Sequence, residues 1–278
     1  MKFTKMQGCG NDYVYVDGFK EKVEDPSAVA RKVSDRHFGI GSDGLVMILP
    51  SETCDFRMRM FNADGSESEM CGNASRCVAR YVYEEGLTAK KTITLETLAG
   101  EKEIKLNFCG DILENIRVDM GVPVLSPEKI PVHVPGTQIV NYPISILGTK
   151  YSFTAVSMGN PHAVFFVEDV GHFPFEMVGP MIENHIFFPN RTNVEFVEVM
   201  DRTHLKMRVW ERGAGETLAC GTGACATLVA SVINGLSDRQ ATLDLKGGQL
   251  EIEWNAINQH VYMTGDAVRV FEGEISLS

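Results

Sequence analysis

The sequence predicts an α/β fold of the α+β type, with two pseudo-symmetric domains that each curl a mostly antiparallel sheet around a central helix. The first observation behind this prediction is an internal repeat with an offset of 149 residues, in which RMRMFNADGSESEMCGN lies over KMRVWERGAGETLACGT. The second is that short strand-like runs surround one helical segment after each repeated cysteine. A register shared over so long a span indicates duplicated halves rather than chance.

Short runs rich in β-branched or aromatic residues indicate the strands. These runs are residues 13–16, 92–95, 103–106, 163–167 and 194–199. Because they occur in both halves of the repeat, we expect each half to contain its own sheet.

Each repeated cysteine precedes a segment with the features of a helix. The segments CVARYVYEEGL and CATLVASVINGL both end in glycine and leucine, and glycine is favoured just beyond the last turn of a helix. The second segment is apolar on almost every side, which suits a helix surrounded by protein. We therefore expect a central helix in each half, with Cys71 and Cys220 at the two helix N-termini.

A proline-rich stretch separates the halves. Residues 121–143 hold five of the eleven prolines and few charges, as a linker or an edge strand would. The boundary is accordingly expected near residue 120, with a first domain over residues 1–120 and a second over residues 121–266.

Composition excludes several classes of function. The net charge of −11 leaves no basic surface for a nucleic-acid backbone, and no apolar run approaches the roughly 18 residues of a membrane span. Seven cysteines, an odd number with neither zinc-ligand spacing nor a disulfide framework, indicate reduced thiols and no metal site. We expect a cytoplasmic protein that binds neither nucleic acid nor membrane.

The predicted helix starts suit the binding of a carboxylate. The first backbone N–H groups of a helix lack partners within the helix and lie at the positive end of its dipole. At the two cysteines these groups belong to Gly72 with Asn73 and to Gly221 with Thr222. A cysteine at such a position has its thiolate favoured, so each half could supply a base or a nucleophile.

Polar residues near the repeated cysteines add recognition groups. Amide donors and acceptors together with a Glu-Arg pair suit a small zwitterion, which needs donors for its carboxylates and acceptors for its ammonium groups. The candidates are Asn11, Asn62, Asn160, Asn193, Glu211 and Arg212.

These motifs give the chain a resemblance to the diaminopimelate epimerase family from end to end. The resemblance is carried by GNDYVYVDG, RHFGIGSDG, FNADGSESEMCGNASRC, VSMGNPHAV, WERGAGETLACGTGACA and VYMTGDA. It implies an epimerase without a cofactor that interconverts LL- and meso-diaminopimelate in the synthesis of lysine and peptidoglycan precursors. It also implies that the last strand returns to the first domain, so that residues 267–278 complete it.

The resemblance assigns roles to individual residues. It implies that Cys71 and Cys220 are the acid and base, and that His162 and Glu211 tune the two thiols. The expected substrate contacts are Asn11, Asn62, Gly72, Asn73, Asn160, Asn193, Glu211, Arg212, Gly221 and Thr222.

The chain departs from the family pattern at positions that bear on binding and assembly. Gly44 stands where some members have a glutamine that contacts substrate, and Ala74 stands where a glycine is common. Phe271 stands where some members have a tyrosine linked to dimer packing, so the ring is kept without its hydroxyl. A homodimer is expected.

Two alternatives remain open. Proline racemases and hydroxyproline epimerases use a similar pair of thiols, but a histidine usually follows the glycine after the first cysteine, where this chain has Asn73. Outside this chemistry, Cys71 and Cys220 could form a redox switch, and counting thiols before and after reduction would distinguish it from a catalytic pair.

Overall fold

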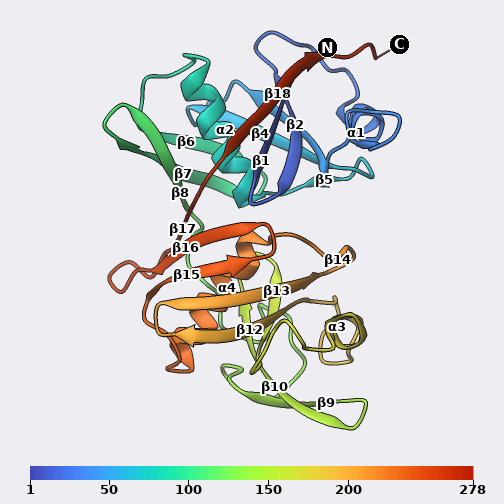
Figure 1. The fold of residues 1–278 in the computed structure, drawn as a ribbon, viewed down its shortest axis with the longest axis vertical. Coiled ribbons are helices and arrows are strands. Elements are labelled where there is room, and N and C mark those ends of the chain that lie inside the picture. The colour runs from blue at the N-terminus through green and yellow to red at the C-terminus, as the bar shows by residue number, and fades with distance from the viewer. Residues whose placement is uncertain (278) are drawn as a thin grey trace. The chain divides into compact units, whose positions relative to one another are not determined.

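The computed structural model describes residues 1–277 and shows a chain of two compact units (Figure 1). The first unit comprises Met1–Asp119 and the C-terminal segment from Thr264 onward, and the second comprises Met120–Met263. Within the described residues, no helix is long and apolar enough to cross a membrane.

The first unit is built on a sheet in which most neighbouring strands are antiparallel. Its strands follow the order β18, β1, β2, β3, β4, β6, β7, β8, with parallel pairing only between β2 and β3 and between β4 and β6 among the printed ladders. A short strand, β5, pairs with β4. The bounds are β1 Lys2–Gly8, β2 Asn11–Asp17, β3 Gly44–Leu49, β4 Phe56–Asn62, β5 Glu67–Ser68, β6 Thr92–Thr97, β7 Gly100–Cys109, β8 Ile112–Asp119 and β18 Val268–Glu274.

Two helices cover opposite faces of this sheet. Helix α1, Pro26–Ser34, buries Ala30 and Val33 in an apolar cluster with β1, β2, β3 and β4. Helix α2, Gly72–Glu84, packs against β1, β2, β7 and β8. Its fully buried Arg76 donates through Nε to the carbonyl oxygen of Asp266 at 2.8 Å, which ties the C-terminal segment to the helix. In Figure 1 the red strand β18 lies beside the blue strand β1.

The second unit repeats this arrangement. Its strands follow the order β9, β10, β11, β12, β13, β15, β16, and the parallel pairs are β11 with β12 and β13 with β15. A short strand, β14, pairs with β13, and β17 begins in this unit. The bounds are β9 Tyr142–Ile146, β10 Thr149–Ser157, β11 Pro161–Phe166, β12 Asn193–Asp201, β13 His204–Glu211, β14 Gly215–Glu216, β15 Gln240–Leu245, β16 Gly248–Trp254 and β17 Val261–Gly265.

Two helices again lie on opposite faces of the sheet. Helix α3, Phe175–Glu183, packs on an apolar cluster that includes Phe165, Val194 and Phe196. Helix α4, Gly221–Ile233, packs against β10, β11, β12, β15 and β16. Its sequence is apolar on almost every side because nine of its thirteen residues are buried.

The repeat seen in the sequence is reproduced residue by residue. Helices α1 and α3, and likewise α2 and α4, have bounds that differ by 149 at both ends. The parallel ladders match too, because Tyr13 pairs with Gly44 in the first unit and His162 with Asn193 in the second. The α+β fold of curled, mostly antiparallel sheets with helices is therefore confirmed.

Most local expectations hold. The five expected strand runs fall in β2, β6, β7, β11 and β12, except that Val167 lies one residue beyond β11. Gly86 and Gly235 follow the two central helices with φ of 68° and 71°, the left-handed conformation that glycine adopts readily. The prolines at 121–143 lie mostly in irregular chain, and β9 starts at Tyr142. Helices α1 and α3 were not anticipated from the sequence.

Candidate active site

The first half of the candidate site is the start of α2. Cys71 is the residue that caps this helix, with extended backbone angles of φ −135° and ψ 122°, and its carbonyl oxygen accepts from the N–H of Ser75 at 2.9 Å. Gly72 and Asn73 are therefore the first two helical residues, and their N–H groups are among those that a helix leaves without internal partners. Glycine at the first position leaves that backbone open to close approach.

The side chain of Cys71 is held by a polar relay. Its thiol donates to Oδ1 of Asn11 at 3.2 Å, and Nδ2 of the same asparagine donates to Oδ2 of Asp43 at 2.7 Å. Because Asp43 accepts from the amide nitrogen, the oxygen of Asn11 is directed at the sulfur. Asn11 from β2 and Asp43 from the loop before β3 thus fix one hydrogen bond of this thiol.

Asp43 belongs to a charged group behind the relay. Arg36 bridges it to Asp12, with Nη2 at 3.0 Å from Oδ1 of Asp43 and 2.9 Å from Oδ1 of Asp12. Burial raises the pKa of Asp43, and the negative charge of Asp12 adds to this effect. Burial also opposes ionisation of Asp12, but hydrogen bonds from Arg36 and Lys5 outweigh it and lower the pKa of Asp12. The group thus contains the carboxylates of Asp12 and Asp43 and the cations Lys5 and Arg36, and it reaches the thiol of Cys71 through Asn11.

The other first-unit candidates differ in how they are held. Asn73 is 1% exposed, and its Oδ1 has no hydrogen-bond partner among the described residues, so it can still accept from a ligand. Asn62 is part-buried at the end of β4, where its Nδ2 donates to the hydroxyl of Ser66 at 3.0 Å within its own turn. Gly44 pairs with Asn62 across the β3–β4 ladder.

The structure explains why position 44 carries no side chain. An ideal Cβ on Gly44 would lie 2.0 Å from the carbonyl oxygen of Phe61 and 2.8 Å from Cε1 of Tyr13. Contacts this short with backbone require the strands to move apart. A glutamine side chain, which the family resemblance would allow at this place, therefore does not fit this backbone.

The second half of the candidate site is the start of α4. Cys220 caps this helix with φ −123° and ψ 110°, and its sulfur accepts from the N–H of Gly223 at 3.4 Å. The hydroxyl of Thr222 lies 3.5 Å from the same sulfur. Gly221 and Thr222 are the first two residues of the helix, and both are part-buried.

The surroundings of Cys220 favour its neutral form. Burial raises the pKa of the Cys220 thiol well above its usual value, and the negative charge of Glu211 raises it further. The hydrogen bonds from Thr222 and Gly223 act in the opposite direction. Glu211 itself accepts a hydrogen bond from the hydroxyl of Thr217. Cys220 is thus held as a thiol, the form that delivers a proton.

Asn160 and His162 lie together with a carboxylate that sequence reasoning missed. His162 is fully buried, and its Nε2 is 3.0 Å from Oδ1 of Asn160. Its Nδ1 is 2.7 Å from Oε1 of Glu195, which is also fully buried. The signal for Glu195 in the sequence was a charged residue between apolar ones in the expected strand segment NVEFVEV.

Asn193 and Arg212 are connected through the backbone. Oδ1 of Asn193 accepts from the N–H of Arg212 at 2.9 Å, and its Nδ2 donates to the carbonyl oxygen of Pro161 at 2.9 Å. The guanidinium of Arg212 is exposed and contacts the carbonyl oxygen of Asn190 at 3.4 Å. Asn193 therefore holds the loop from which Arg212 projects.

A second buried acid, Glu183, holds the same loop. Its Oε1 accepts from the N–H of Gly213 at 2.8 Å, and its Oε2 accepts from the indole N–H of Trp210 at 2.8 Å. Sequence reasoning missed Glu183 because it lies at the end of α3, a helix that was not expected. It likewise missed the role of Asp43, although this residue stands within the quoted motif RHFGIGSDG.

The candidate residues thus form two groups, one in each unit. The first contains Asn11 and Cys71 in direct contact, with Gly72 and Asn73 on the same helix turn and Asn62 in a neighbouring turn. The second contains three connected sets, which are Asn160 with His162, Asn193 with Arg212, and Cys220 with Thr222.

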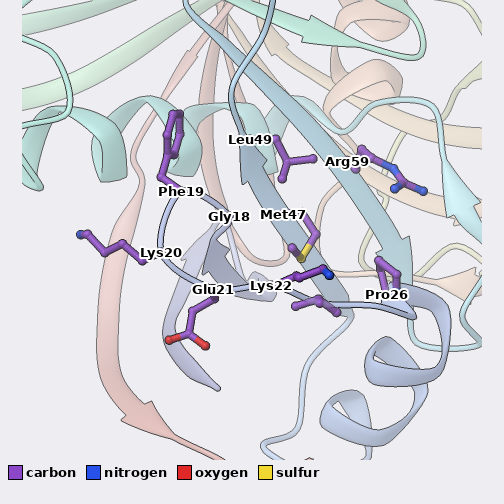
Figure 2. Close-up of a pocket in the computed structure, with 10 residues that line it drawn as sticks. Gly18, Phe19, Lys20, Glu21, Lys22, Pro26, Met47, Leu49 and Arg59 are labelled. Carbon is purple, nitrogen blue, oxygen red and sulfur yellow. The ribbon is translucent and has the colours of Figure 1, made fainter.

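Two further features lie outside these groups. Among residues 1–277, no cluster of three or more His, Cys, Asp or Glu side chains is placed to hold a metal ion. A cavity of about 270 Å³ lies on the first unit, and none of the candidate residues lines it (Figure 2). Its lining consists of Gly18, Phe19, Lys20, Glu21, Lys22, Val23, Pro26, Met47, Leu49 and Arg59.

Comparison with known families gives a match over most of the chain. The model of the family described as diaminopimelate epimerase matches residues 3–126 and 154–270. The diaminopimelate epimerase of Acetivibrio thermocellus is 62% identical over 278 residues, which cover 100% of this chain and 99% of that protein. The diaminopimelate epimerase of Methanococcus maripaludis is 58% identical over 277 residues, which cover both chains completely.

Solved structures share the fold at much lower identity. A phenazine biosynthesis protein of the PhzF family from Bacillus anthracis has a TM-score of 0.73 at 18% identity and covers 100% of this chain and 99% of its own. A probable proline racemase from Agrobacterium radiobacter has a TM-score of 0.69 at 15% identity and covers 100% of this chain and 93% of its own. At these identities the likeness concerns the fold alone.

Proposed function

The chain belongs to the diaminopimelate epimerase family, and we propose that it interconverts LL- and meso-2,6-diaminopimelate in the synthesis of lysine and peptidoglycan precursors. The enzyme is an isomerase. The observation that carries the proposal is that each unit presents a cysteine as the cap of a buried helix, with bounds related by the same offset as the sequence repeat.

Inversion at an α-carbon needs a base on one face and an acid on the other. In the proposed reaction the thiolate of one cysteine removes the α-proton, and the thiol of the other delivers a proton to the opposite face of the carbanion. The sulfur that gave up its proton is then the base for the reverse direction. Cys220 suits the acid role in one direction because burial and the charge of Glu211 favour its thiol.

The helix starts support the carbanion in this proposal. As the α-proton leaves, negative charge spreads onto the adjacent carboxylate. The N–H groups of Gly72 and Asn73, with those of Gly221 and Thr222, lie where helix dipoles are positive and are fixed before the reaction begins. The buried amide oxygen of Asn73, which has no partner among the described residues, can accept from the α-ammonium group of the substrate. The reaction so proposed needs no cofactor.

The remaining candidates are proposed to recognise the substrate. Asn11 contacts Cys71, Asn160 contacts His162, and the charge of Glu211 acts on Cys220. Arg212 instead projects from a loop that Asn193 and Glu183 hold. We assign Arg212, Asn62 and Asn193 to the distal amino-acid end. The reacting end is held largely by backbone, which every α-amino acid can use equally, so selectivity is expected from the distal contacts.

The test is epimerisation of LL-diaminopimelate in heavy water, with proline and glutamate as control substrates. Product formed in either direction should acquire deuterium at the α-carbon, because the delivering thiol exchanges with solvent. Cys71→Ala and Cys220→Ala should each abolish epimerisation, and the serine variants should lose about 10²-fold or more because a hydroxyl is a poor acid and base near neutral pH. Cys109→Ala, at an exposed cysteine, is the matched control.

The outcomes of this test are distinct. Unlabelled early product, or near-normal activity in either alanine variant, would mean that the two-cysteine mechanism is wrong for this chain. Turnover of proline with no turnover of diaminopimelate would favour the proline racemase alternative.

We further propose a cytoplasmic homodimer in which β18 contributes to the interface. This strand exposes Val268, Val270 and Phe271, with 37%, 54% and 46% of each residue accessible. The ring of Phe271 packs edge-to-face on the ring of Phe3, with 5.9 Å between the ring centroids, and this contact holds Phe271 in place. Sedimentation should give a dimer for the wild type and a monomer for Val270→Asp/Phe271→Asp. A wild-type monomer at micromolar concentration would contradict the interface.

We also propose that the two compact units act as the two half-domains of the enzyme. The proposed domains are residues 1–120, completed by residues 267–278, and residues 121–266. The observed split between Asp119 and Met120 lies one residue from this boundary, and the C-terminal segment joins the first unit from Thr264, three residues earlier than proposed, which supports the division. The bond from Arg76 to Asp266 supports this return. Truncation before Thr264 should therefore destabilise the first unit, as measured by proteolysis.

A further inference from the structure

Glu195 carries a carboxylate at a fully buried position of β12, where an apolar side chain is usual. In the parallel ladder of β11 and β12, His162 pairs with Asn193 and Val164 pairs with Glu195, so these four side chains share one face. The alternate residues, including Phe165, Val194 and Phe196, face the apolar cluster under α3. Glu195 is therefore buried on the face toward α4.

The hydrogen bonds of His162 imply a shared proton. Oδ1 of Asn160 can only accept, so Nε2 of His162 carries a proton toward it at 3.0 Å. The contact between Nδ1 of His162 and Oε1 of Glu195 is 2.7 Å and needs one more proton between its two atoms. Wherever that proton rests, the pair as a whole carries no net charge. The other oxygen, Oε2, has no hydrogen-bond partner within residues 1–277.

The same carboxylate lies beside the candidate catalytic thiol. A Cβ built on Gly223 would lie 2.7 Å from Oε1 of Glu195 and 3.3 Å from Sγ of Cys220, so the acid and the sulfur flank a single glycine. A negative charge this close in a buried site opposes formation of a thiolate. The charge state of Glu195 therefore bears directly on Cys220.

Few other charges face Cys220 in the second unit. His162 and Glu195 face α4 from β11 and β12, and Glu211 at the end of β13 is the other acid whose charge acts on this thiol. The first turn of α4 contains no acidic residue, and the buried residues of β10, β15 and β16 are uncharged. Compensation of Glu195 is thus expected to come from His162.

The first unit has no such pair at the corresponding places. With the offset of 149, His162 corresponds to Tyr13 and Glu195 to Val46, and both stand on the ladder that matches β11 and β12. The pair is therefore not required by the repeated fold. It distinguishes the surroundings of Cys220 from those of Cys71.

We propose that Glu195 is a positioning residue, which shares one proton with His162 and thereby holds the imidazole against Asn160 while its own charge beside Cys220 is neutralised. This inference rests on the proposed function in assigning Cys220 to the reaction. The compensation of Glu195 by His162 does not itself depend on which substrate the enzyme uses.

The test reads the thiolate of Cys220 without substrate. The initial rate of alkylation by iodoacetamide at one fixed pH is followed for each cysteine by peptide mass spectrometry, because the thiolate is the reacting form. His162→Gln leaves the charge of Glu195 uncompensated and should lower the Cys220 rate about tenfold or more, which corresponds to one pKa unit. In the double variant His162→Gln/Glu195→Gln, the alkylation rate of Cys220 should return to within about threefold of wild type.

Two controls accompany these variants. Glu198→Gln changes a part-exposed acid on the same strand and should leave the Cys220 rate unchanged. Cys109, which is exposed, serves as the internal reference in every sample. If His162→Gln does not fold, recovery of folding in the double variant supports the same compensation, whereas failure of both variants to fold overturns it.

The positioning role is read separately from kinetics. Glu195→Leu removes the partner of Nδ1 and should lower kcat for diaminopimelate about tenfold or more, with Glu195→Gln intermediate because its amide can still donate to Nδ1. A Cys220 rate that His162→Gln leaves unchanged, or that Glu195→Gln fails to restore, overturns the inference. Since alkylation uses no substrate, that result is separate from a failure of the wild type to epimerise diaminopimelate.

Discussion

The thiol of Cys71 donates to the side-chain oxygen of Asn11, with 3.2 Å between sulfur and oxygen. Asn11 can present this oxygen only because its amide nitrogen is taken by Asp43 at 2.7 Å. If the amide turned around, its N–H groups would meet the sulfur and its oxygen would meet a carboxylate. The orientation of Asn11 thus connects the sulfur of Cys71 to the charged group that contains Asp43.

Asp43→Asn should lower kcat about tenfold or more, because the new amide can satisfy either orientation of Asn11 and no longer enforces one. Steady-state kinetics with diaminopimelate measures the effect. Asp169→Asn is the control, since this exposed acid holds a turn of the second unit through the N–H groups of Gly171 and His172 and pairs with the imidazole of His172, away from the candidate site. Unchanged kinetics in Asp43→Asn would show that the relay does not orient Asn11.

Arg212→Lys should raise KM or lower turnover about tenfold. The planar guanidinium can hold a carboxylate with two parallel hydrogen bonds, and a lysine ammonium cannot reproduce that geometry. The loop itself should stay in place, because Asn193 and Glu183 hold it through the N–H groups of residues 212 and 213. Arg202→Lys, at an exposed arginine paired with Asp238, is the matched control. Kinetics like those of the wild type would remove Arg212 from the distal contacts.

Gly44→Ala should destabilise the protein by about 1–3 kcal/mol, the usual effect of forcing an extra carbon into a packed interior. The new Cβ would meet the carbonyl oxygen of Phe61 at 2.0 Å, and backbone cannot rotate away as a flexible side chain can. Urea unfolding measures the change. Gly171→Ala is the comparison, because its Cβ would meet only the side chain of Asp169 at 3.2 Å. Equal stability of the two variants would contradict the packing at Gly44.

Buried thiols should make the protein less stable as the pH rises. Burial raises the pKa of Cys77 from 9.0 to about 12, so the unfolded chain loses this proton near pH 9 while the folded chain keeps it. The contribution is therefore complete below pH 9 and is lost as the pH rises from there to about 12. In this window the free energy of unfolding should fall by about 1.4 kcal/mol per pH unit for each such group.

Urea unfolding at pH 8 to 11 checks this slope. Cys77→Ala should make the slope shallower, whereas Cys109→Ala should leave it unchanged because that cysteine is exposed. The absolute stability of Cys77→Ala will also fall, since the side chain is fully buried, so the slope and not the level is the measure. An identical slope in wild type and Cys77→Ala would contradict the assignment.

The sequence alone was sufficient for the features that depend on neighbours along the chain. The repeat, the helix starts at Cys71 and Cys220, and the glycines that end both central helices were all visible, because capping and periodicity act over a few residues. Helix α1 had such a signal in Asp25 followed by Pro26, and Asp25 does accept from the N–H of Ala28. Helix α3 had weaker signals, since its capping residue is Pro174 and Pro180 lies inside it.

Tertiary structure decided which polar groups meet. Asp43 contacts Asn11 across 32 positions of sequence and Glu195 contacts His162 across 33, because parallel strands bring distant residues onto one face. Exclusion of a side chain at Gly44 depends likewise on a neighbouring strand. A hydrogen bond acts over about 3 Å and carries no periodic trace in the chain, so only the packed sheets determine these partners.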